Sequence, residues 1–400
     1  MLKQIIKKQS YTRIIRHISM LKFPFSHSKE EQIEKLFSSQ VKSNKQQEKC
    51  LSKMNKYREI NIDDYSEKIL NSEDYPIDIC RKYMQNDLIG IIGYGPQGRN
   101  QARNLVDNKY NVIVGVRKDG DSWELAKKDG WIPNENLYDI ETVSKKANVI
   151  KYLLSDAGQI EMWNSIKNNI QKGDTLYFSH GFGLVYKHLT GIEPRTDVDI
   201  ILLAPKGPGG NLRKQFLEKR GIACSYAIYQ DYTGNALNKI KALGFGIGAK
   251  NMFETTFEKE VYSDLTGERC VLMGMIQGAF KAQFDVLVEN GHSPTEAWYE
   301  TVEEALESLY PLINEKGMDW MFENCSTTAQ RGALDWSDKF YNVIKPEIKN
   351  CYSRVVSGEE AETVIEANKD PNYRINLEKE LNVIKGQTIW KSGNQLRLLR

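Results

Sequence analysis

The amino-acid sequence predicts an α/β protein in which a doubly wound sheet is followed by an all-helical domain. Two observations support this prediction. Over residues 58–246, short apolar runs alternate with helix-compatible stretches, as in sheets whose strands are covered by helices on both faces. From residue 247 to residue 400, the pattern and the composition are helical. We therefore expect a domain boundary near residue 246 and a separate N-terminal segment, residues 1–57, that belongs to neither domain.

The composition is that of a globular chain. Of its 400 residues, 40% are hydrophobic and 27% are charged, and no run of about 18 apolar residues predicts a membrane-spanning helix. The net charge of +2 argues against a dedicated nucleic-acid-binding protein, which would carry a concentrated basic surface. The six cysteines form no Cys-x-x-Cys pair, which predicts reduced thiols in an intracellular compartment and neither a disulfide framework nor a zinc site.

The N-terminal segment has the features of an organelle transit peptide. Residues 1–29 contain seven Lys and Arg residues interleaved with apolar residues, and they contain no Asp or Glu. A basic, amphipathic segment without acids predicts import into the mitochondrial matrix. A plastid is the alternative destination, and a basic surface helix is the alternative structure. Residues 28–57 continue as a polar linker rich in Lys, Gln and Ser.

The clearest local signal is a glycine-rich turn between two expected strands. The apolar run Leu88–Ile92 leads directly into Gly93-Tyr94-Gly95-Pro96-Gln97-Gly98, and a helix-compatible stretch and a second apolar run, Val112–Val116, follow. This order of strand, Gly-x-Gly-x-x-Gly, helix and strand predicts a Rossmann-type dinucleotide site, because the glycines let the backbone approach a pyrophosphate at a helix N-terminus. The residues expected to bind the cofactor here are Gly93, Tyr94, Gly95, Gln97 and Gly98.

The end of the second strand indicates which dinucleotide binds. Sites for NAD place an Asp or Glu about 20 residues after the glycines, where it binds the 2′-hydroxyl of the ribose. This chain has Arg117 at that position, with Lys118 beside it and Ser122 nearby. Two cations and a hydroxyl suit the 2′-phosphate of NADPH, so we expect Arg117 and Ser122 to bind it. The acidic Asp119 and Asp121 weaken this preference.

Two polar residues follow later strands of the expected sheet. His180 comes after the run Thr175–Phe178, and Lys206 comes after the run Val198–Leu203. Ligands of doubly wound sheets bind beyond the carboxyl ends of the strands, so both residues are candidates for a catalytic site. Each lies among glycines, which permit the close approach of a substrate.

Two pairs of acidic residues have a spacing that suits a metal site. Asp264 and Glu268 are four residues apart, as are Glu300 and Glu304, and no Lys or Arg occurs between residues 291 and 316. Like charges at this spacing destabilise a helix unless a cation balances them. Oxygen ligands alone predict a hard cation, most simply Mg²⁺.

Together these motifs resemble the ketol-acid reductoisomerase (acetohydroxyacid isomeroreductase) family, in particular its short, fungal mitochondrial type. The matching segments occur in the order of the family over roughly residues 60–400, and they are Gly93–Gly98, Val114–Arg117, Ser179–Phe182, Ala204–Gly209, Asp264–Glu268, Glu300–Glu304 and Cys325–Ala329. One departure is Pro96, which replaces a serine common in the glycine loop of the family. Because proline has no backbone N–H, it removes one phosphate donor.

The resemblance implies an activity and a function for each candidate residue. The family converts 2-acetolactate and 2-aceto-2-hydroxybutyrate, which are 2-hydroxy-3-oxo acids, into 2,3-dihydroxy acids in valine and isoleucine biosynthesis. An alkyl migration precedes hydride transfer from NADPH, and Mg²⁺ polarises the substrate oxygens. The residues that match the ligands of two Mg²⁺ ions are Asp264, Glu268, Glu300 and Glu304. The residues that match the catalytic site are His180, Lys206, Glu304, which would also handle protons, and Ser326, which would contact the substrate carboxylate.

The resemblance also implies partners. It predicts a homodimer or a dimer-based oligomer in which the second carboxylate pair and Ser326 reach the active site from the partner subunit. It further implies a knotted C-terminal domain, which is an exception among protein folds. Neither nucleic acid nor a membrane is expected as a partner.

Two other functions are compatible with the sequence. A different NADP-dependent dehydrogenase of the β-hydroxyacid type would share both domains but would require no metal, so dependence on Mg²⁺ distinguishes it. A non-catalytic NADP-binding protein that packages DNA would use the basic N-terminal segment and would show a salt-dependent affinity for DNA.

Overall fold

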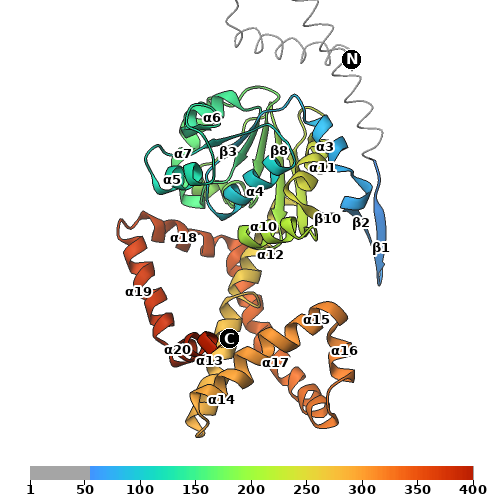
Figure 1. Ribbon diagram of the computed structural model, residues 1–400, viewed down its shortest axis with the longest axis vertical. Helices are drawn as coiled ribbons and strands as arrows, with labels where there is room; N and C mark the ends of the chain where they lie inside the picture. Colours follow the sequence, from blue (N-terminus) through green and yellow to red (C-terminus); the bar gives the residue numbers. More distant parts are fainter. Residues whose placement is uncertain (1–54, 400) are drawn as a thin grey trace, which may run out of the picture. The chain divides into compact units, whose positions relative to one another are not determined.

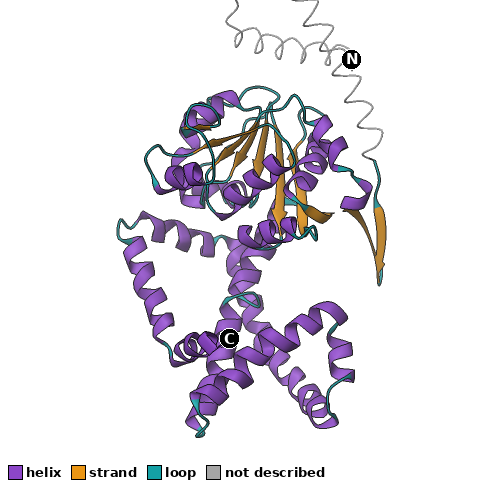
Figure 2. Ribbon diagram, viewed as in Figure 1, coloured by secondary structure: helices purple, strands orange, loops and turns teal. Residues whose placement is uncertain are grey.

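The computed structural model describes residues 55–399, so the expected transit peptide and nearly all of the expected linker lie outside the described residues. The chain divides into two compact units, of which the first ends at Glu260 and the second begins at Val261 (Figure 1). Within residues 55–399, the strands belong to the first unit and the second unit is helical (Figure 2). The expected order of an α/β domain and a helical domain is therefore confirmed.

The first unit is built on one ten-stranded sheet with the spatial order β1-β2-β10-β9-β8-β7-β6-β3-β4-β5 (Figure 1). Its strands are β1 (Arg58–Ile62), β2 (Tyr65–Asn71), β3 (Ile89–Ile92), β4 (Val112–Gly115), β5 (Leu137–Tyr138), β6 (Val149–Tyr152), β7 (Thr175–Phe178), β8 (Asp199–Pro205), β9 (Ile222–Gln230) and β10 (Ala249–Glu254). Strand β3 pairs in parallel with β4 on one side and with β6 on the other.

The strand order reverses at β3. After β3 the chain adds β4 and β5 on one side of it and then returns to place β6, β7 and β8 on its other side. Such a reversal leaves a crevice beyond the carboxyl ends of the strands, which is where doubly wound sheets bind their ligands. The end of β3, where the glycine-rich turn begins, therefore lies at the expected binding position.

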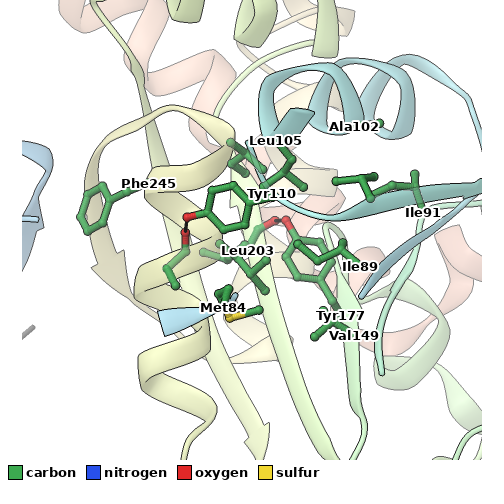
Figure 3. Close-up of a cluster of buried hydrophobic side chains, with 14 of the residues drawn as sticks. Met84, Ile89, Ile91, Ala102, Leu105, Tyr110, Val149, Tyr177, Leu203 and Phe245 are labelled. Carbon is green, nitrogen blue, oxygen red and sulfur yellow. Dashed lines mark hydrogen bonds between the residues drawn. The ribbon is translucent and has the colours of Figure 1, made fainter. Parts of the chain in front are cut away.

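Helices cover both faces of this sheet (Figure 1). They are α3 (Ile77–Tyr83), α4 (Pro96–Asp107), α5 (Asp121–Lys128), α6 (Ile140–Lys146), α7 (Asp156–Lys167), α8 (Phe182–Val185), α9 (Lys187–Thr190), α10 (Gly209–Leu217) and α11 (Ala236–Ile247), with a short 3₁₀ turn η1 (Ser72–Asp74). Along β3, Ile89 and Ile91 belong to one buried cluster, and Ile92 belongs to another. Figure 3 shows the first cluster, to which Leu203 of β8 and Leu105 of α4 also belong. Burial of both faces explains why the strand is continuously apolar.

The sheet is mixed, and it includes a strand where a helical pattern was expected. Strand β9 is antiparallel to β8, and β10 is parallel to β9 and antiparallel to β2. Residues 249–254 were expected to begin the helical region, and this prediction is wrong. Only Ala249 and Met252 of β10 are buried, so buried and exposed residues do not alternate along this strand as they do in a typical half-buried strand. Its extended form depends on hydrogen bonds to β2 and β9, which are distant in the sequence.

The second unit is formed by helices within the described residues (Figure 2). They are α12 (Phe257–Arg269), which begins in the first unit, α13 (Gly274–Glu289), α14 (Pro294–Trp298), the π-helical segments η2 (Tyr299–Glu303) and η3 (Ala305–Leu309), α15 (Tyr310–Lys316), α16 (Met318–Glu323), α17 (Thr327–Ser357), α18 (Glu359–Lys369), α19 (Tyr373–Gly386), α20 (Thr388–Leu396) and the 3₁₀ turn η4 (Arg397–Leu399).

Trp298 is the centre of the core of the second unit. Its side chain is 1% exposed and packs in a cluster with Phe280, Phe284 and Ile389. Helix α20 lies so close to this side chain that a Cβ atom on Gly393 would come within 2.2 Å of the indole ring. The stretch Phe257–Glu289 is long and apolar enough to cross a membrane, with a mean hydropathy of 1.2 over a window of 18 residues, but a single stretch of this kind is only a weak indication of a membrane span.

Candidate active site

The glycine-rich turn has the geometry that a dinucleotide site requires. Gly93 has a φ of +99°, and a Cβ atom there would lie 2.6 Å from the carbonyl oxygen of Leu153. A Cβ atom on Gly98 would lie 2.1 Å from the carbonyl oxygen of Gly93, so α4 begins in direct contact with the turn. A Cβ atom on Gly95, in contrast, would meet nothing within 4 Å. Gly95 is the N-cap of α4, so this open space adjoins a helix N-terminus, where a pyrophosphate binds well.

Two further residues of the turn, Tyr94 and Gln97, make specific side-chain contacts. Tyr94 is buried, and its hydroxyl donates to Asp129 at 2.9 Å and accepts from Trp131 Nε1 at 2.7 Å. Burial and the Asp129 carboxylate raise the pKa of Tyr94. Gln97 donates from Nε2 to the carbonyl oxygen of Gly207 at 3.1 Å. The side chain of Tyr94 therefore fixes the turn from within the protein, while Gln97 joins it to the loop after β8.

The two basic residues near the expected 2′-phosphate position are each paired with a carboxylate. Arg117 follows β4 and forms an ion pair of 2.6 Å with Glu161 of α7. Lys118 lies 3.8 Å from Asp139, the residue that precedes α6. Ser122 lies in the first turn of α5. The pairing of Arg117 with Glu161 was not apparent from the sequence, because the two residues are 44 positions apart.

Three ionisable side chains meet at the carboxyl edge of the sheet. His180 is in the loop after β7, Lys206 is in the loop after β8, and Glu260 is in α12. His180 Nδ1 lies 3.2 Å from Glu260 Oε2, and Lys206 Nζ lies 3.3 Å from Glu260 Oε1. The side chain of Glu260 is only 1% exposed, whereas those of His180 and Lys206 are 24% and 32% exposed. A buried carboxylate therefore contacts two partly exposed basic side chains.

The electrostatics of this cluster keep Glu260 ionised. Burial alone would raise the pKa of Glu260, but the interactions with His180 and Lys206 outweigh burial, so that its pKa lies below its usual value. Sequence analysis did not single out Glu260. Its spacing was the available signal, since Glu260, Asp264 and Glu268 follow one another at intervals of four residues on one helix.

The expected metal ligands lie on helices. Asp264 and Glu268 are one turn apart on α12, where Asp264 is half-buried and Glu268 is exposed. Glu300 lies in the π-helical segment η2, and Glu304 follows its last residue; both are exposed. Ser326 is the N-cap of α17, where its Oγ accepts from the backbone N–H of Ala329 at 3.2 Å. Two carboxylate pairs thus occur on separate helical segments, and π-helical turns are frequent at functional sites.

Comparison with known proteins identifies the family. Residues 83–252 match the model for the acetohydroxy acid isomeroreductase NADPH-binding domain, and residues 257–400 match the model for the ketol-acid reductoisomerase C-terminal domain. The chain is 53% identical over 336 residues to the mitochondrial ketol-acid reductoisomerase of Neurospora crassa, covering 84% of each chain. It is 50% identical over 341 residues to the ketol-acid reductoisomerase (NAD(+)) of Desulfosudis oleivorans, covering 85% of this chain and 97% of the relative.

A solved structure agrees with these matches. The NADH-preferring ketol-acid reductoisomerase from an uncultured archean superposes with a TM-score of 0.74 at 32% sequence identity, covering 83% of this chain and 99% of that structure. The resemblance that the sequence motifs indicated is therefore confirmed. The chain belongs to the ketol-acid reductoisomerase family.

Proposed function

We propose that this chain is a Mg²⁺-dependent ketol-acid reductoisomerase that uses NADPH to convert 2-acetolactate and 2-aceto-2-hydroxybutyrate into 2,3-dihydroxy acids, as a step of valine and isoleucine biosynthesis. The observation that carries this proposal is the cluster of His180, Lys206 and Glu260. It lies at the carboxyl edge of a sheet whose glycine-rich turn has the geometry of a dinucleotide site.

In this proposal Glu260 orients the two bases. An ammonium group has three N–H donors, and Lys206 directs one of them at Glu260, which leaves two to stabilise negative charge on a substrate oxygen. The Nδ1 atom of His180 faces Glu260. Its Nε2 atom is therefore the one that can hold or release a proton near the substrate. Because the interactions with His180 and Lys206 lower the pKa of Glu260, its carboxylate form is favoured, and this form can orient both side chains.

Asp264, Glu268, Glu300 and Glu304 are the residues that we assign to two Mg²⁺ ions. All four offer carboxylate oxygens, which hard divalent cations prefer, and each pair comes from one helical segment. When bound, Mg²⁺ acts as a Lewis acid on the substrate oxygens and as a template for the substrate. We assign Glu304 also to proton handling at the substrate hydroxyl.

Ser326 is the residue that we assign to the substrate carboxylate. Its oxygen accepts from the backbone of α17, and its O–H can still donate to an anion. The N-terminus of a 31-residue helix supplies further N–H groups and a favourable dipole at the same place.

For the cofactor, the open space at Gly95 suits the pyrophosphate, and Arg117 and Ser122 suit the 2′-phosphate of NADPH. The ion pair between Arg117 and Glu161 reduces the positive charge offered to that phosphate. One relative of similar identity is named for NAD(+), so the assay of this chain includes both NADPH and NADH.

A second copy of the chain is the expected partner. Glu300, Glu304 and Ser326 are exposed in the single chain, as expected for side chains that complete a site on another subunit. Helix α17 also exposes a series of large apolar side chains, namely Leu334, Trp336, Phe340, Tyr341 and Val343. Large apolar side chains exposed in this number on one helix are typical of an interface, which supports a homodimer or a dimer-based oligomer.

The mitochondrial matrix is the location that we assign to this chain. The Neurospora crassa relative is named as mitochondrial, and residues 1–29 have the composition of a transit peptide.

The test is oxidation of NADPH and, in parallel, of NADH by the full chain with 2-acetolactate, measured with Mg²⁺ and with EDTA. Two variants accompany it, Glu300→Gln and the control Glu296→Gln. Glu296 is an exposed acid of the neighbouring α14 that contacts His292 at 3.1 Å and has no assigned function. We expect turnover that requires Mg²⁺, that Glu300→Gln abolishes and that Glu296→Gln retains.

Other results would favour the alternatives. Turnover that persists in EDTA would indicate a metal-free dehydrogenase. NADPH binding without any turnover would indicate a non-catalytic protein, and equal loss of activity in both variants would refute the assignment of Glu300 as a metal ligand.

A further inference from the structure

A buried polar cluster lies directly beneath the loops of the candidate active site. Its centre is Gln101 of α4, whose side chain is fully buried. The hydroxyl of Tyr177, at the middle of β7, donates to Gln101 Oε1 at 2.9 Å. Figure 3 shows the Tyr177 side chain among the buried residues of this face of the sheet. An amide placed among apolar side chains is costly unless all of its hydrogen bonds are made, so this position demands specific partners.

The amide nitrogen of Gln101 connects the start of α4 with the histidine loop. Gln101 Nε2 lies 3.0 Å from Gln97 Oε1, in the glycine-rich turn, and 2.8 Å from Ser179 Oγ, in the loop after β7. Ser179 directly precedes His180. Gln97 and Gln101 belong to the same helix, so the Gln101 side chain orients Gln97 at the start of α4, next to the glycine-rich turn, and joins this helix to the histidine loop.

The third loop is joined through Gln97. With its oxygen held by Gln101, the Gln97 amide is oriented so that its nitrogen donates to the carbonyl oxygen of Gly207 at 3.1 Å. Gly207 directly follows Lys206. The loops that carry the cofactor turn, His180 and Lys206 thus depend on one network whose central member is Gln101.

We propose that Gln101 is a positioning residue that holds the cofactor turn in register with His180 and Lys206. This inference rests on the proposed function. Gln101 touches none of the reacting groups, but the relative position of cofactor and bases is what the network fixes. A displacement of about 1 Å between reacting groups lowers catalysis about 100-fold, whereas the fold itself tolerates such a shift.

The decisive experiment compares two buried amides of the same helix. Gln101→Met replaces the central amide by an apolar side chain of similar length. Asn104→Leu is the matched control, because Asn104 is fully buried one turn further along α4 but its amide bonds to Ile247 at 2.8 Å and to Arg213 at 2.7 Å, not to the three loops. Ser179→Ala removes only the connection to the histidine loop.

Steady-state kinetics with NADPH and 2-acetolactate give the first readout, and urea denaturation gives the stability of each variant. We expect Gln101→Met to lower kcat about 10- to 100-fold and to raise KM for NADPH several-fold. Ser179→Ala should lower kcat with KM for NADPH unchanged, and Asn104→Leu should lose stability but keep kcat within about twofold. The proposal is overturned if Gln101→Met and Asn104→Leu lower kcat by the same factor.

A second readout does not depend on turnover. The dissociation constant of NADPH, from quenching of protein fluorescence, should rise several-fold in Gln101→Met and stay unchanged in Asn104→Leu. An inactive wild-type protein that still shows this difference would refute the proposed function while supporting the role of Gln101 in holding the cofactor turn. Equal NADPH affinities in all variants would overturn that role.

Discussion

The Oε1 atom of Glu260 lies 3.3 Å from the Nζ atom of Lys206, although the two residues are 54 positions apart and come from a helix and a loop. The acid is almost fully buried, and the base is partly exposed. Removing the cationic partner of a buried carboxylate strongly destabilises a fold, because the remaining charge is buried and unpaired. The orientation of the lysine and the stability of this part of the fold are therefore coupled.

Replacing the buried acid tests this coupling. We predict that Glu260→Gln lowers kcat about 10- to 100-fold, because Lys206 and His180 lose the group that orients them. Breaking a buried charge pair should also lower the free energy of unfolding by about 3 kcal/mol. Steady-state kinetics and urea denaturation measure the two effects. Full activity in this variant would show that the bases need no buried partner.

The interaction of Glu260 with Lys206 should also make the stability of the protein depend on pH. Because the pKa of Glu260 is lower in the folded protein than in the unfolded chain, its stabilising contribution is complete above the unfolded pKa and is lost as the pH falls through the folded pKa. The stability difference between wild type and Glu260→Gln should therefore be constant at neutral pH and should shrink below about pH 4.5. A difference that grows on acidification would contradict this assignment.

For Lys151 we predict the opposite effect of a substitution, namely a gain in stability. It lies fully buried in β6, its Nζ atom is 3.7 Å from the centroid of the Tyr177 ring, and within residues 55–399 this nitrogen has no hydrogen-bond partner. Burial lowers the pKa of Lys151 well below its usual value. We predict that Lys151→Met stabilises the protein by about 1–3 kcal/mol, because methionine fills similar space without an unsatisfied amine.

The sign of the pH effect follows from the proton count. Because burial lowers the pKa of Lys151, the unfolded chain binds more protons at this position than the folded chain wherever the pH lies between the two pKa values, so stability should rise with pH in that interval. Lys151→Met should reduce this slope. Urea denaturation of both proteins between about pH 6 and pH 9 tests it, and identical slopes would mean that the buried amine remains charged.

Because Glu161 pairs with Arg117, we predict that the protein discriminates only weakly between NADPH and NADH. Arg117 follows β4 and Glu161 follows β6, so the pair connects the two strands that flank β3 and its glycine-rich turn. Removing the carboxylate should increase the attraction for a 2′-phosphate. We predict that Glu161→Gln raises the ratio of kcat/KM for NADPH to that for NADH about three- to tenfold.

A matched control separates this effect from a general change of charge. Asp78→Asn removes an equally exposed carboxylate that pairs with Arg81 at 2.7 Å on α3. It should leave the cofactor ratio unchanged. If both variants shift the ratio equally, Glu161 has no specific effect on the 2′-phosphate.

Gly209 tests the contact between the lysine loop and the cofactor turn. A Cβ atom on Gly209 would lie 2.0 Å from the carbonyl oxygen of Pro96, so the two backbones touch. We predict that Gly209→Ala raises KM for NADPH at least tenfold and lowers stability by about 1–3 kcal/mol. The neighbouring Gly210 has nothing within 4 Å of its Cβ position, so Gly210→Ala should be nearly neutral. Equal effects of both substitutions would argue against this contact.

Local patterns were sufficient to predict much of the fold. The apolar run Leu88–Ile92 and the glycines after it predicted β3 and its turn, and the polar residues after later strands predicted His180 and Lys206 at one edge. Each of these signals lies within a few residues of the feature that it predicts. Strand β10 depends on pairing with β2 and β9, which are remote in the sequence, and no local pattern revealed it.

The interactions that organise the site were not predicted, for the same reason. Glu260 becomes significant only when folding brings it to His180 and Lys206, and Arg117 meets Glu161 only through the order of the strands. Gln101 is an unremarkable polar residue in the sequence of α4. Its burial and its three partners exist only in the folded sheet.

The identity of the product tests the central claim most directly. The full chain is incubated with 2-acetolactate, NADPH and Mg²⁺, and the product is identified by proton NMR. Alkyl migration before reduction gives 2,3-dihydroxy-3-methylbutanoate, in which two methyl groups share one carbon and both appear as singlets. Reduction without migration gives the isomer 2,3-dihydroxy-2-methylbutanoate, in which one methyl group is a doublet. We predict two singlets and one NADPH consumed per product, and a methyl doublet would contradict the assignment of a reductoisomerase.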